Sequence, residues 1–464
     1  MRSTLDQPVL RAIARLAPFA ALSFILQNAY NQLDAWFLGR VGPTASNALG
    51  LFMMVQIANF GVVLVLARGT QSLVGRRLGA GAGTGAALAT AQGLSLAARV
   101  VLPVTALQWI FAPQILAFMG GRGEAVEQAT LFLRTLYLFM PALFAQPLLD
   151  FVFQALGDTR TPFRMQLVAL AVNAALNAVL VLPHELTVLG HTVHVGGLGV
   201  AGSALATGLS RLLAACILFV LLVRRYHWAT LLSRAGYAWD GPVAREILRV
   251  GLPAGLATIA YSVVGVFVLQ VVGRFGQDAY GAYGIGFRGV ESFSFMILLG
   301  VGTATATVVA HAVGAGDFVR ARRAGHVGTA LGAGCMAATG AVFLLAGRPL
   351  ASIYTSDPGL LDIAAGYIGV MAFCQVPQAL ETVYSDAMAG AGSTLRTVLI
   401  SIPGNVLRVP LAWYLASGRG LGLRGVWYAI LVSAALKGAG VSALYLSGRW
   451  EAAALHGRRM AEAA

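Results

Sequence analysis

The chain contains the same series of short motifs twice, in the same order. The paired motifs are Gly39-Arg40-Val41-Gly42 and Gly273-Arg274-Phe275-Gly276, Gly69-Thr70 and Gly302-Thr303, Gly79-Ala80-Gly81 and Gly314-Ala315-Gly316, Gly157-Asp158-Thr159 and Gly392-Ser393-Thr394, and Gly199-Val200-Ala201-Gly202 and Gly422-Leu423-Arg424-Gly425. The first four pairs are offset by 233 to 235 residues and the last by 223, since one loop is shorter in the second half. We infer that one ancestral half was duplicated. In a hydrophobic chain, such a repeat predicts a transporter whose pathway lies between the halves.

Composition places this repeat in a membrane. The chain is 58% hydrophobic and 11% charged, with a mean hydropathy of +0.76, whereas a soluble domain has about 25% charged residues. Apolar runs of about 20 residues, the length that crosses a bilayer as a helix, recur along it. The sequence therefore predicts an all-α polytopic membrane protein whose main partner is the lipid bilayer.

We predict twelve transmembrane helices in two six-helix lobes. The expected spans are 14–38, 46–67, 85–107, 127–155, 163–183, 196–223, 247–273, 279–311, 324–347, 362–390, 397–417 and 422–447. An even number of spans in each half makes the repeat parallel, so a pseudo-two-fold axis should run along the membrane normal. The polar stretch 224–245 is the expected seam, which gives an N-terminal lobe over 1–228 and a C-terminal lobe over 229–464.

Arginines set the predicted orientation. With the N-terminus inside, nineteen arginines of the loops and span ends fall on the inner side and six on the outer side. This bias predicts a bacterial cytoplasmic membrane protein with both termini in the cytoplasm. The same distribution explains the net charge of +14. We expect no nucleic-acid partner, because the arginines form no basic stripe on a soluble face. We expect a monomer.

The sequence predicts neither a metal site nor a cofactor. Cys216, Cys335 and Cys374 all lie in apolar runs without ligand spacing. His184, His191 and His194 fall in a loop with the pattern of a small β-hairpin, and histidines of an exposed loop are usually solvated rather than metal-bound. The only lysine, Lys437, stands outside any phosphate-binding loop, so no Walker A motif exists. Nothing predicts an enzyme.

The ordered motifs resemble the multidrug and toxic compound extrusion (MATE) family. Asp34-Ala35-Trp36-Phe37-Leu38-Gly39 resembles its first helix, Gly157-Asp158-Thr159-Arg160-Thr161-Pro162 its fourth-to-fifth loop, and Arg408-Val409-Pro410-Leu411-Ala412 its eleventh helix. The resemblance covers nearly the whole chain. It implies an antiporter that exports organic cations or amphipathic drugs in exchange for H⁺ or Na⁺.

The resemblance also implies a cation-coupling site in the N-terminal lobe. Asp34 matches the acid of the family's first helix, and Tyr30, Asn177 and Thr207 match its polar companions. Many members carry a second aspartate four residues after the Asn177 position, where this chain has Val181. The acid that a Na⁺-driven branch places in the seventh helix is also missing, since 250–273 contains none. Both departures favour H⁺ over Na⁺.

The residues themselves support a role for Asp34. It is the only acid of its span, and an intramembrane acid is costly and usually functional. Burial disfavours its charged form, so that it could exchange a proton for a cation. Tyr30, four residues earlier, lies on the same helix face. The alternative is that Asp34 lies at the helix end near Gly39 and faces water.

Four other charged residues and one proline are candidates. Glu381 and Asp386 could bind substrate or take part in coupling, although they are five residues apart and so point about 140° away from each other. Glu381 could instead form an interhelical ion pair with a buried arginine. Arg288 and Glu291, three residues apart, are expected to form a structural salt bridge. Pro18, on the Asp34 helix, could act as a hinge or produce a static kink.

Two other functions stay open at this point. A flippase for a lipid-linked precursor, from the same superfamily, would need basic residues against a pyrophosphate. Arg211, Arg288, Arg408 and Lys437 could provide them, although twelve spans are fewer than the fourteen common there. A receptor or scaffold without transport would not need the paired halves or the intramembrane acid.

Overall fold

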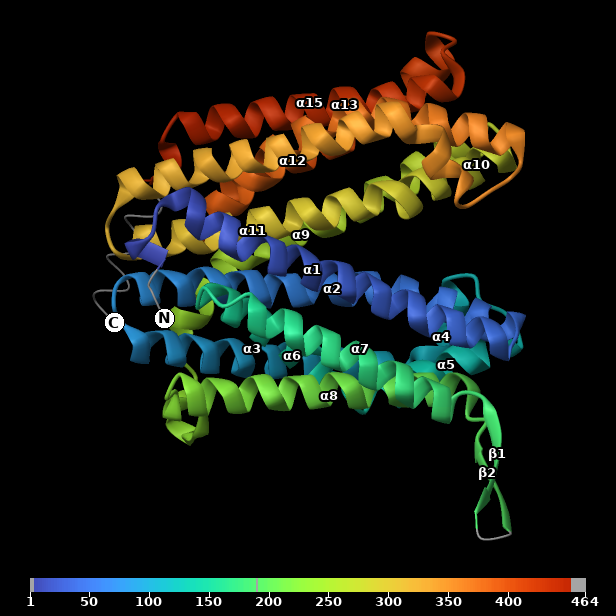
Figure 1. Cartoon of the computed structure of the whole chain (residues 1–464), viewed down its shortest axis with the longest axis horizontal. Helices are drawn as coiled ribbons and strands as arrows, with labels where there is room; N and C mark the ends of the chain where they lie inside the picture. Colours follow the sequence, from blue (N-terminus) through green and yellow to red (C-terminus); the bar gives the residue numbers. More distant parts are fainter. Residues whose placement is uncertain (1–3, 189–190, 452–464) are drawn as a thin grey trace.

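The computed structural model describes residues 4–188 and 191–451 as a bundle of long helices (Figure 1). The first half contains α1 (Val9–Val41), α2 (Pro43–Gly79), α3 (Gly83–Ile110), α4 (Ala112–Phe118), α5 (Glu124–Tyr137), α6 (Met140–Ala155), α7 (Arg160–Leu180) and α8 (Gly199–Arg225). The second half contains α9 (Gly241–Gly273), α10 (Gln277–Gly284), the π-helical turn η4 (Ile285–Glu291), α11 (Ser292–Gly314), α12 (Phe318–Ser352), α13 (Pro358–Gly390), α14 (Leu395–Trp413), the π-helical turn η5 (Tyr414–Gly418) and α15 (Gly422–Leu446). The all-helical membrane fold predicted from the sequence is confirmed.

Each predicted span coincides with a helix or a helix series. Among the described residues, ten segments are long and apolar enough to cross a membrane, and α5 with α6 makes an eleventh. The remaining prediction, 46–67, falls within the 37 residues of α2. The fourth span differs from the simple expectation, because α5 and α6 meet at a bend of 62°. Pro141 stands in the first turn of α6, where the missing N–H of proline is tolerated but cannot continue a preceding helix.

The long helices form two lobes that lie side by side in Figure 1. The packing between the lobes is reciprocal: α1 of the first packs on α11 of the second, and α9 of the second packs on α2 of the first. Since α9 repeats α1 and α11 repeats α2, this exchange is what a two-fold axis between the lobes produces. The connection from α8 to α9 contains only the short turns η2 (Ala229–Leu232) and η3 (Arg234–Tyr237). The lobe boundary at 228/229 stays a prediction.

The termini and the hairpin lie at opposite ends of the molecule (Figure 1). The expected hairpin is present as β1 (Pro183–Val188) and β2 (His191–Gly196), which pair antiparallel with Val188 opposite His191. The side chains of His184, His191 and His194 lie outside the described residues, so the absence of a metal there stays an expectation. Within the described part of the chain, no group of metal-ligating side chains is found.

Repeated glycines bring the lobes together at the end that carries the termini. A Cβ on Gly79 would lie 2.1 Å from the backbone oxygen of His311, and one on Gly314 would lie 2.0 Å from that of Arg76. Gly79 and Gly314 are equivalent in the repeat, as are Arg76 and His311, at an offset of 235. The two contacts are therefore the same contact related by the two-fold axis. Only glycine allows backbones to approach this closely.

Polar bonds between the lobes gather at the same end. Arg68 on α2 forms an ion pair of 3.2 Å with Asp386 on α13, and Arg76 one of 2.8 Å with Glu246 on α9. Ser72 donates to the carbonyl oxygen of Ala389 over 2.6 Å. Among the described residues, no side-chain hydrogen bond or ion pair joins the lobes at the hairpin end. The structure is closed at the end of the termini.

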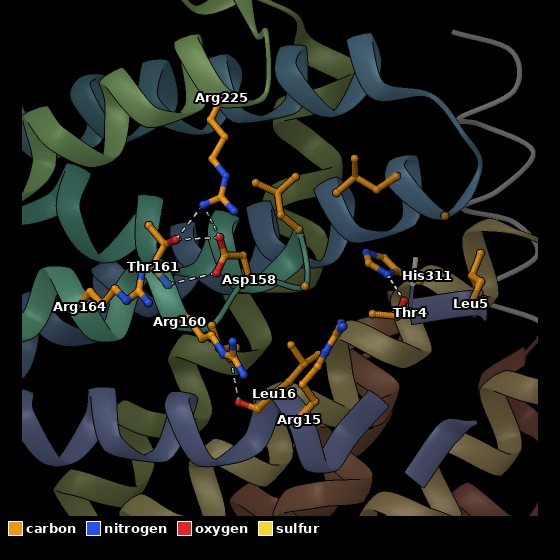
Figure 2. A pocket seen from close by; sticks show the side chains of 15 residues that line it. Thr4, Leu5, Arg15, Leu16, Asp158, Arg160, Thr161, Arg164, Arg225 and His311 are labelled. Carbon is orange, nitrogen blue, oxygen red and sulfur yellow. Dashed lines mark hydrogen bonds and ion pairs between the residues drawn. The ribbon is translucent and has the colours of Figure 1, made fainter. Parts of the chain in front are cut away.

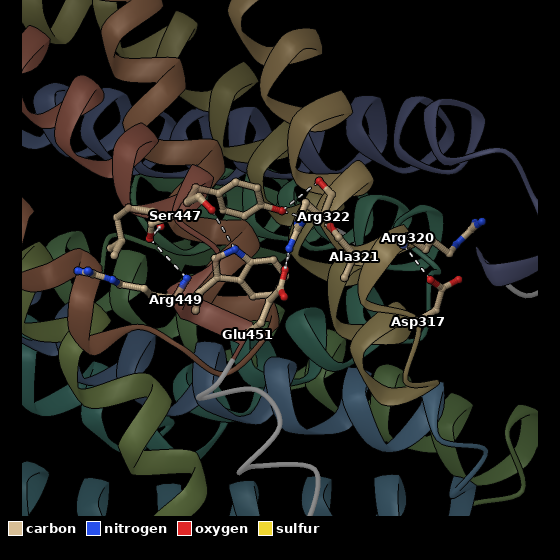
Figure 3. A network of polar contacts seen from close by, with 10 residues as sticks. Asp317, Arg320, Ala321, Arg322, Ser447, Arg449 and Glu451 are labelled. Atoms are coloured by element: carbon tan, nitrogen blue, oxygen red, sulfur yellow. Dashed lines mark hydrogen bonds and ion pairs between the residues drawn. The ribbon is translucent and has the colours of Figure 1, made fainter.

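The end of the last helix is held to the start of α12 (Figure 3). Arg322 donates to Glu451 over 2.7 and 3.0 Å, and the buried Trp450 ring nitrogen donates to the Tyr445 carbonyl oxygen over 3.2 Å. Asp317 caps α12 by accepting from the backbone N–H of Arg320. These bonds fix the segment after α15 to α12 within the C-terminal lobe.

Candidate functional site

Asp34 lies inside the N-terminal lobe and accepts three hydrogen bonds. Asp34 is 5% exposed. Asn173 and Asn177, on α7, donate to Oδ1 over 3.2 and 3.0 Å. Thr207, on α8, donates to Oδ2 over 2.8 Å. The carboxylate therefore joins three helices, and neutral donors alone compensate its lost hydration.

The structure brings Tyr30, Asn177 and Thr207 together around Asp34, as the sequence predicted for their positions. Tyr30, one turn before Asp34, donates to the Thr207 carbonyl oxygen over 3.2 Å and also contacts the hydroxyl of Ser210. Tyr30 is 1% exposed and Asn177 is fully buried. The water-facing alternative for Asp34 is wrong, because α1 continues seven residues beyond it to Val41 and its side chain is enclosed.

A second buried acid, Asp150 on α6, was missed by the sequence analysis. Its Oδ2 accepts from Gln146 over 2.8 Å and from Gln166 over 2.9 Å. Its Oδ1 is buried and has no hydrogen-bond partner among the described residues. A signal existed, because Asp150 is an acid within a predicted span, the criterion that selected Asp34.

Arg211 connects the surroundings of the two acids. Its guanidinium lies over the Tyr30 ring, 4.6 Å from the ring centre, and donates to Gln146 over 2.6 Å. Gln146 in turn donates to Asp150. The chain Asp34–Thr207–Tyr30–Arg211–Gln146–Asp150 is a continuous series of contacts inside one lobe. A change of charge at Asp34 or at Asp150 therefore changes the electrostatic energy of Arg211, which lies between them.

Glu381 and Asp386 lie on the same helix, α13, but in different surroundings. Glu381 forms an ion pair of 2.8 Å with Lys437 on α15 and accepts from Ser401 over 2.8 Å. Asp386 faces the other lobe and pairs with Arg68. The two acids thus share no common cavity, in agreement with their helical separation. The partner of Glu381 is the chain's only lysine rather than an arginine.

The salt bridge expected between Arg288 and Glu291 is wrong. Glu291 is buried and accepts from Tyr367 over 2.5 Å and from Gln378 over 2.9 Å, whereas Arg288 is exposed. No ion pair joins the two among the described residues. The physical reason is local: both belong to the π-helical turn η4, in which residues three apart no longer stack on one face.

Pro18 lies inside α1, which continues through it without a break. The proline removes one backbone hydrogen bond of this helix sixteen residues before Asp34. Its role as a hinge stays a prediction.

Comparison with known proteins identifies the fold and its family. The family model MatE matches residues 20–179 and 253–414, one block in each lobe. The chain belongs to the MatE family. Its members are transporters and not enzymes, so the sequence expectation is confirmed at this level. The matched blocks contain Asp34, Asn177 and Glu381.

Curated relatives extend over most of this MatE chain. A probable multidrug resistance protein NorM of Thermotoga maritima is 25% identical over 446 residues, 95% of this chain and 93% of its own length. A probable multidrug resistance protein NorM of Caulobacter vibrioides is 30% identical over 375 residues, covering 79% and 76%. A solved multidrug resistance MATE family transporter in an outward-facing conformation has a TM-score of 0.85 at 22% identity, with 97% of each chain covered. This last likeness concerns the fold.

Proposed function

We propose that this MatE transporter exports organic cations or amphipathic drugs in exchange for protons, with Asp34 as the carboxyl that carries the proton. The observation that carries the proposal is the enclosed carboxylate on three neutral donors from α7 and α8. Relatives that match it along most of its length are named multidrug resistance proteins. Tyr30, Asn177 and Thr207 are proposed as the residues that position Asp34.

Protonation of Asp34 would change the bonds between helices. A protonated carboxyl has one hydrogen to donate, but all three of its present partners donate to it. Thr207 can rotate its hydroxyl from donor to acceptor, whereas the two amide nitrogens cannot accept. When the proton is on Oδ2, that oxygen donates to Thr207, and Oδ1 stays a carbonyl oxygen that still accepts from both amides. Proton binding therefore weakens the bonds to α7, because they are no longer assisted by the carboxylate charge, and reverses the direction of the bond to α8. This local change is a physical means by which a proton alters the lobe.

The same donors favour H⁺ over Na⁺ as the coupling ion. A metal cation needs oxygen ligands, but Asn173 and Asn177 direct their NH₂ groups toward the carboxylate. Both amides would have to turn over to bind Na⁺. Val181, where many relatives are expected to carry a second acid, is buried and apolar. Proton exchange needs only Asp34, with Asp150 as a second acid linked to it through Arg211.

The acids of the C-terminal lobe fit different parts of the same cycle. Glu381 is proposed as a substrate-binding residue, since a cationic drug can replace the charge of Lys437 beside it. Asp386 is proposed to take part in coupling through its ion pair with Arg68, which must break when the lobes separate at that end. Alternating access then consists of opening the closed end and closing the other.

The flippase alternative receives less support from the basic residues. A pyrophosphate needs several unneutralised cations in one place. Lys437 is neutralised by Glu381, and Arg211 is enclosed in the other lobe with Gln146. Arg288 is exposed, whereas Arg408 is buried with its guanidinium 5.8 Å from the centre of the Tyr261 ring. The four basic residues therefore do not share one environment.

The coupling ion can be tested in proteoliposomes that contain the full chain. Ethidium efflux is expected to follow an imposed pH gradient, to collapse with a protonophore and to persist without sodium. Removal of the pH gradient should reduce the rate of ethidium efflux at least about tenfold. This is the factor that corresponds to a difference of one unit in the pKa of the coupling carboxyl between the two conformations. Efflux that requires sodium and ignores the pH gradient would contradict proton coupling.

Orientation needs a separate test. We propose that the end carrying the termini is cytoplasmic, which makes the present closed end the inner one. Cysteine at position 122 is expected to react with an impermeant maleimide added outside cells, and cysteine at position 234 only after lysis, with Cys216, Cys335 and Cys374 replaced. Both positions are exposed, so accessibility to the reagent reports the side of the membrane. The opposite labelling pattern would invert the topology.

A further inference from the structure

A charged pocket lies at the end of the molecule that carries the termini. It has a volume of about 410 Å³ and lies beside the turn between α6 and α7, the repeated Gly157-Asp158-Thr159 motif. Figure 2 shows four arginines from three helices around it: Arg15 on α1, Arg160 and Arg164 on α7, and Arg225 on α8. His311, on α11 of the other lobe, lies on its wall. Neither Asp34 with its hydrogen-bond partners nor Glu381 lines this pocket.

Asp158 is the only acid among the described residues that line the pocket, and it is already engaged. Asp158 accepts from the backbone N–H and the hydroxyl of Thr161, over 3.1 and 2.7 Å, and pairs with Arg225 over 3.3 Å. Asp158 thereby also caps the start of α7. Against four arginines this leaves a formal charge of +3 when His311 is neutral.

Three of the arginines keep their charge available. Arg15 and Arg164 form no ion pair with any residue that the structure describes, and Arg160 only lies over the Phe19 ring at 5.0 Å. Three like charges around one small space repel one another unless an anion lies between them. The free donors of guanidinium groups suit the oxygens of a phosphate group, which they bind in pairs.

The internal repeat shows that this cluster is not a property of the fold alone. At the offset of 235, Leu395 and Leu399 of α14 replace Arg160 and Arg164. Both leucines are exposed, at 61% and 66%. The general preference for arginine on the inner side of a membrane applies to both halves of the chain. It does not explain why arginines line one cavity at these positions of the first half while leucines occupy the equivalent positions of the second.

The wall of the pocket also joins the two lobes. Thr4 donates to Nδ1 of His311, and His311 donates through Nε2 to the Ala155 carbonyl oxygen over 2.7 Å. Within the N-terminal lobe, Thr159, beside Asp158, donates to the Leu16 carbonyl oxygen of α1 over 3.0 Å. A ligand in the pocket would therefore contact residues that hold the lobes together at this end.

We propose that this pocket binds a phosphate group, carried by an anionic lipid headgroup or free in solution. The anionic lipids of an inner leaflet present such groups at the depth of helix ends, and basic pockets between helices bind them. Binding neutralises Arg15, Arg160 and Arg164 together and stabilises the conformation that is closed at this end.

The test measures lipid binding to the purified full chain in detergent by native mass spectrometry. Phosphatidylglycerol is expected to bind at least about tenfold more weakly to the Arg15→Gln/Arg164→Gln double variant than to the parent, because two charge-assisted contacts are lost. The matched control is Arg234→Gln, an exposed arginine of η3 away from the pocket, which should bind as the parent does. Zwitterionic phosphatidylcholine should bind equally weakly to all three.

Two further measurements keep the result interpretable. Thermal unfolding of each variant without lipid checks the fold, and an Arg15→Lys/Arg164→Lys variant should restore part of the binding. Inorganic phosphate that displaces phosphatidylglycerol at millimolar concentration would assign the pocket to free phosphate, and lack of competition would assign it to lipid. Equal loss in Arg234→Gln, or no loss in the double variant, would overturn the proposal.

Discussion

Asp34→Asn is expected to insert and fold like the parent chain but to lose proton-driven efflux, by about tenfold or more. Asparagine keeps the volume of the side chain and its ability to accept from Thr207, but it does not titrate between pH 5 and 9. A difference of one unit in the pKa of Asp34 between the two conformations would change the ratio of their populations tenfold. Without a titrating group at position 34 this factor is lost, and transport should fall by at least as much. The measurement is ethidium efflux from proteoliposomes under an imposed pH gradient.

A matched control separates this effect from a general loss of charge. Asp362→Asn makes the same chemical change at a side chain that is 63% exposed and pairs with Arg348. It should transport at the parent rate, since exposed ion pairs contribute little. Parent-rate efflux in Asp34→Asn would remove Asp34 from the coupling mechanism and leave Asp150 as the N-terminal acid to test.

Gly314→Val is expected to abolish transport by preventing closure at the end that carries the termini. A Cβ at this position would lie 2.0 Å from the Arg76 backbone oxygen, whereas ordinary contacts begin near 3.4 Å, so the helices must separate by about 1.4 Å. Backbone cannot yield as a side chain can. The ion pair between Arg68 and Asp386 should open with it.

The expected displacement can be measured with spin labels at positions 83 and 319. They lie at the same end of the molecule, one in each lobe; a Cβ at Gly83 meets no atom within 4 Å, and Val319 is 83% exposed. Gly314→Val should shift their distance distribution to longer values, with efflux at background. Gly366→Val, where a Cβ meets no atom within 4 Å, is the control and should change neither. An unchanged distribution in Gly314→Val would show that the closed end does not depend on this glycine contact.

The repeat and the hydropathy of the chain alone determine its fold class. The lengths of the apolar runs located the helical segments, because a bilayer requires about 20 residues of helix whatever its neighbours are. Among the described residues, ten of these segments, or eleven with the bent pair of α5 and α6, are long and apolar enough to cross a membrane. The break between α5 and α6 beside Pro141 was not predicted, since 127–155 was expected as one span. Turn residues identified the hairpin between positions 183 and 196. These are local requirements, which neighbouring residues in the chain satisfy among themselves.

Side-chain partners were decided by tertiary structure. The sequence indicated Asp34 as an intramembrane acid, but not that Asn173 would share it with Asn177, or that Arg211 would lie between it and Asp150. The expected pair of Arg288 and Glu291 assumed α-helical spacing, and the π-helical turn moved them apart. The glycine contact between Gly79 and His311 appears only when the two lobes meet. The contacts of Asp34, Arg211 and Gly79 join residues 65 to 232 positions apart, and no local preference of the chain encodes their distance or their partner.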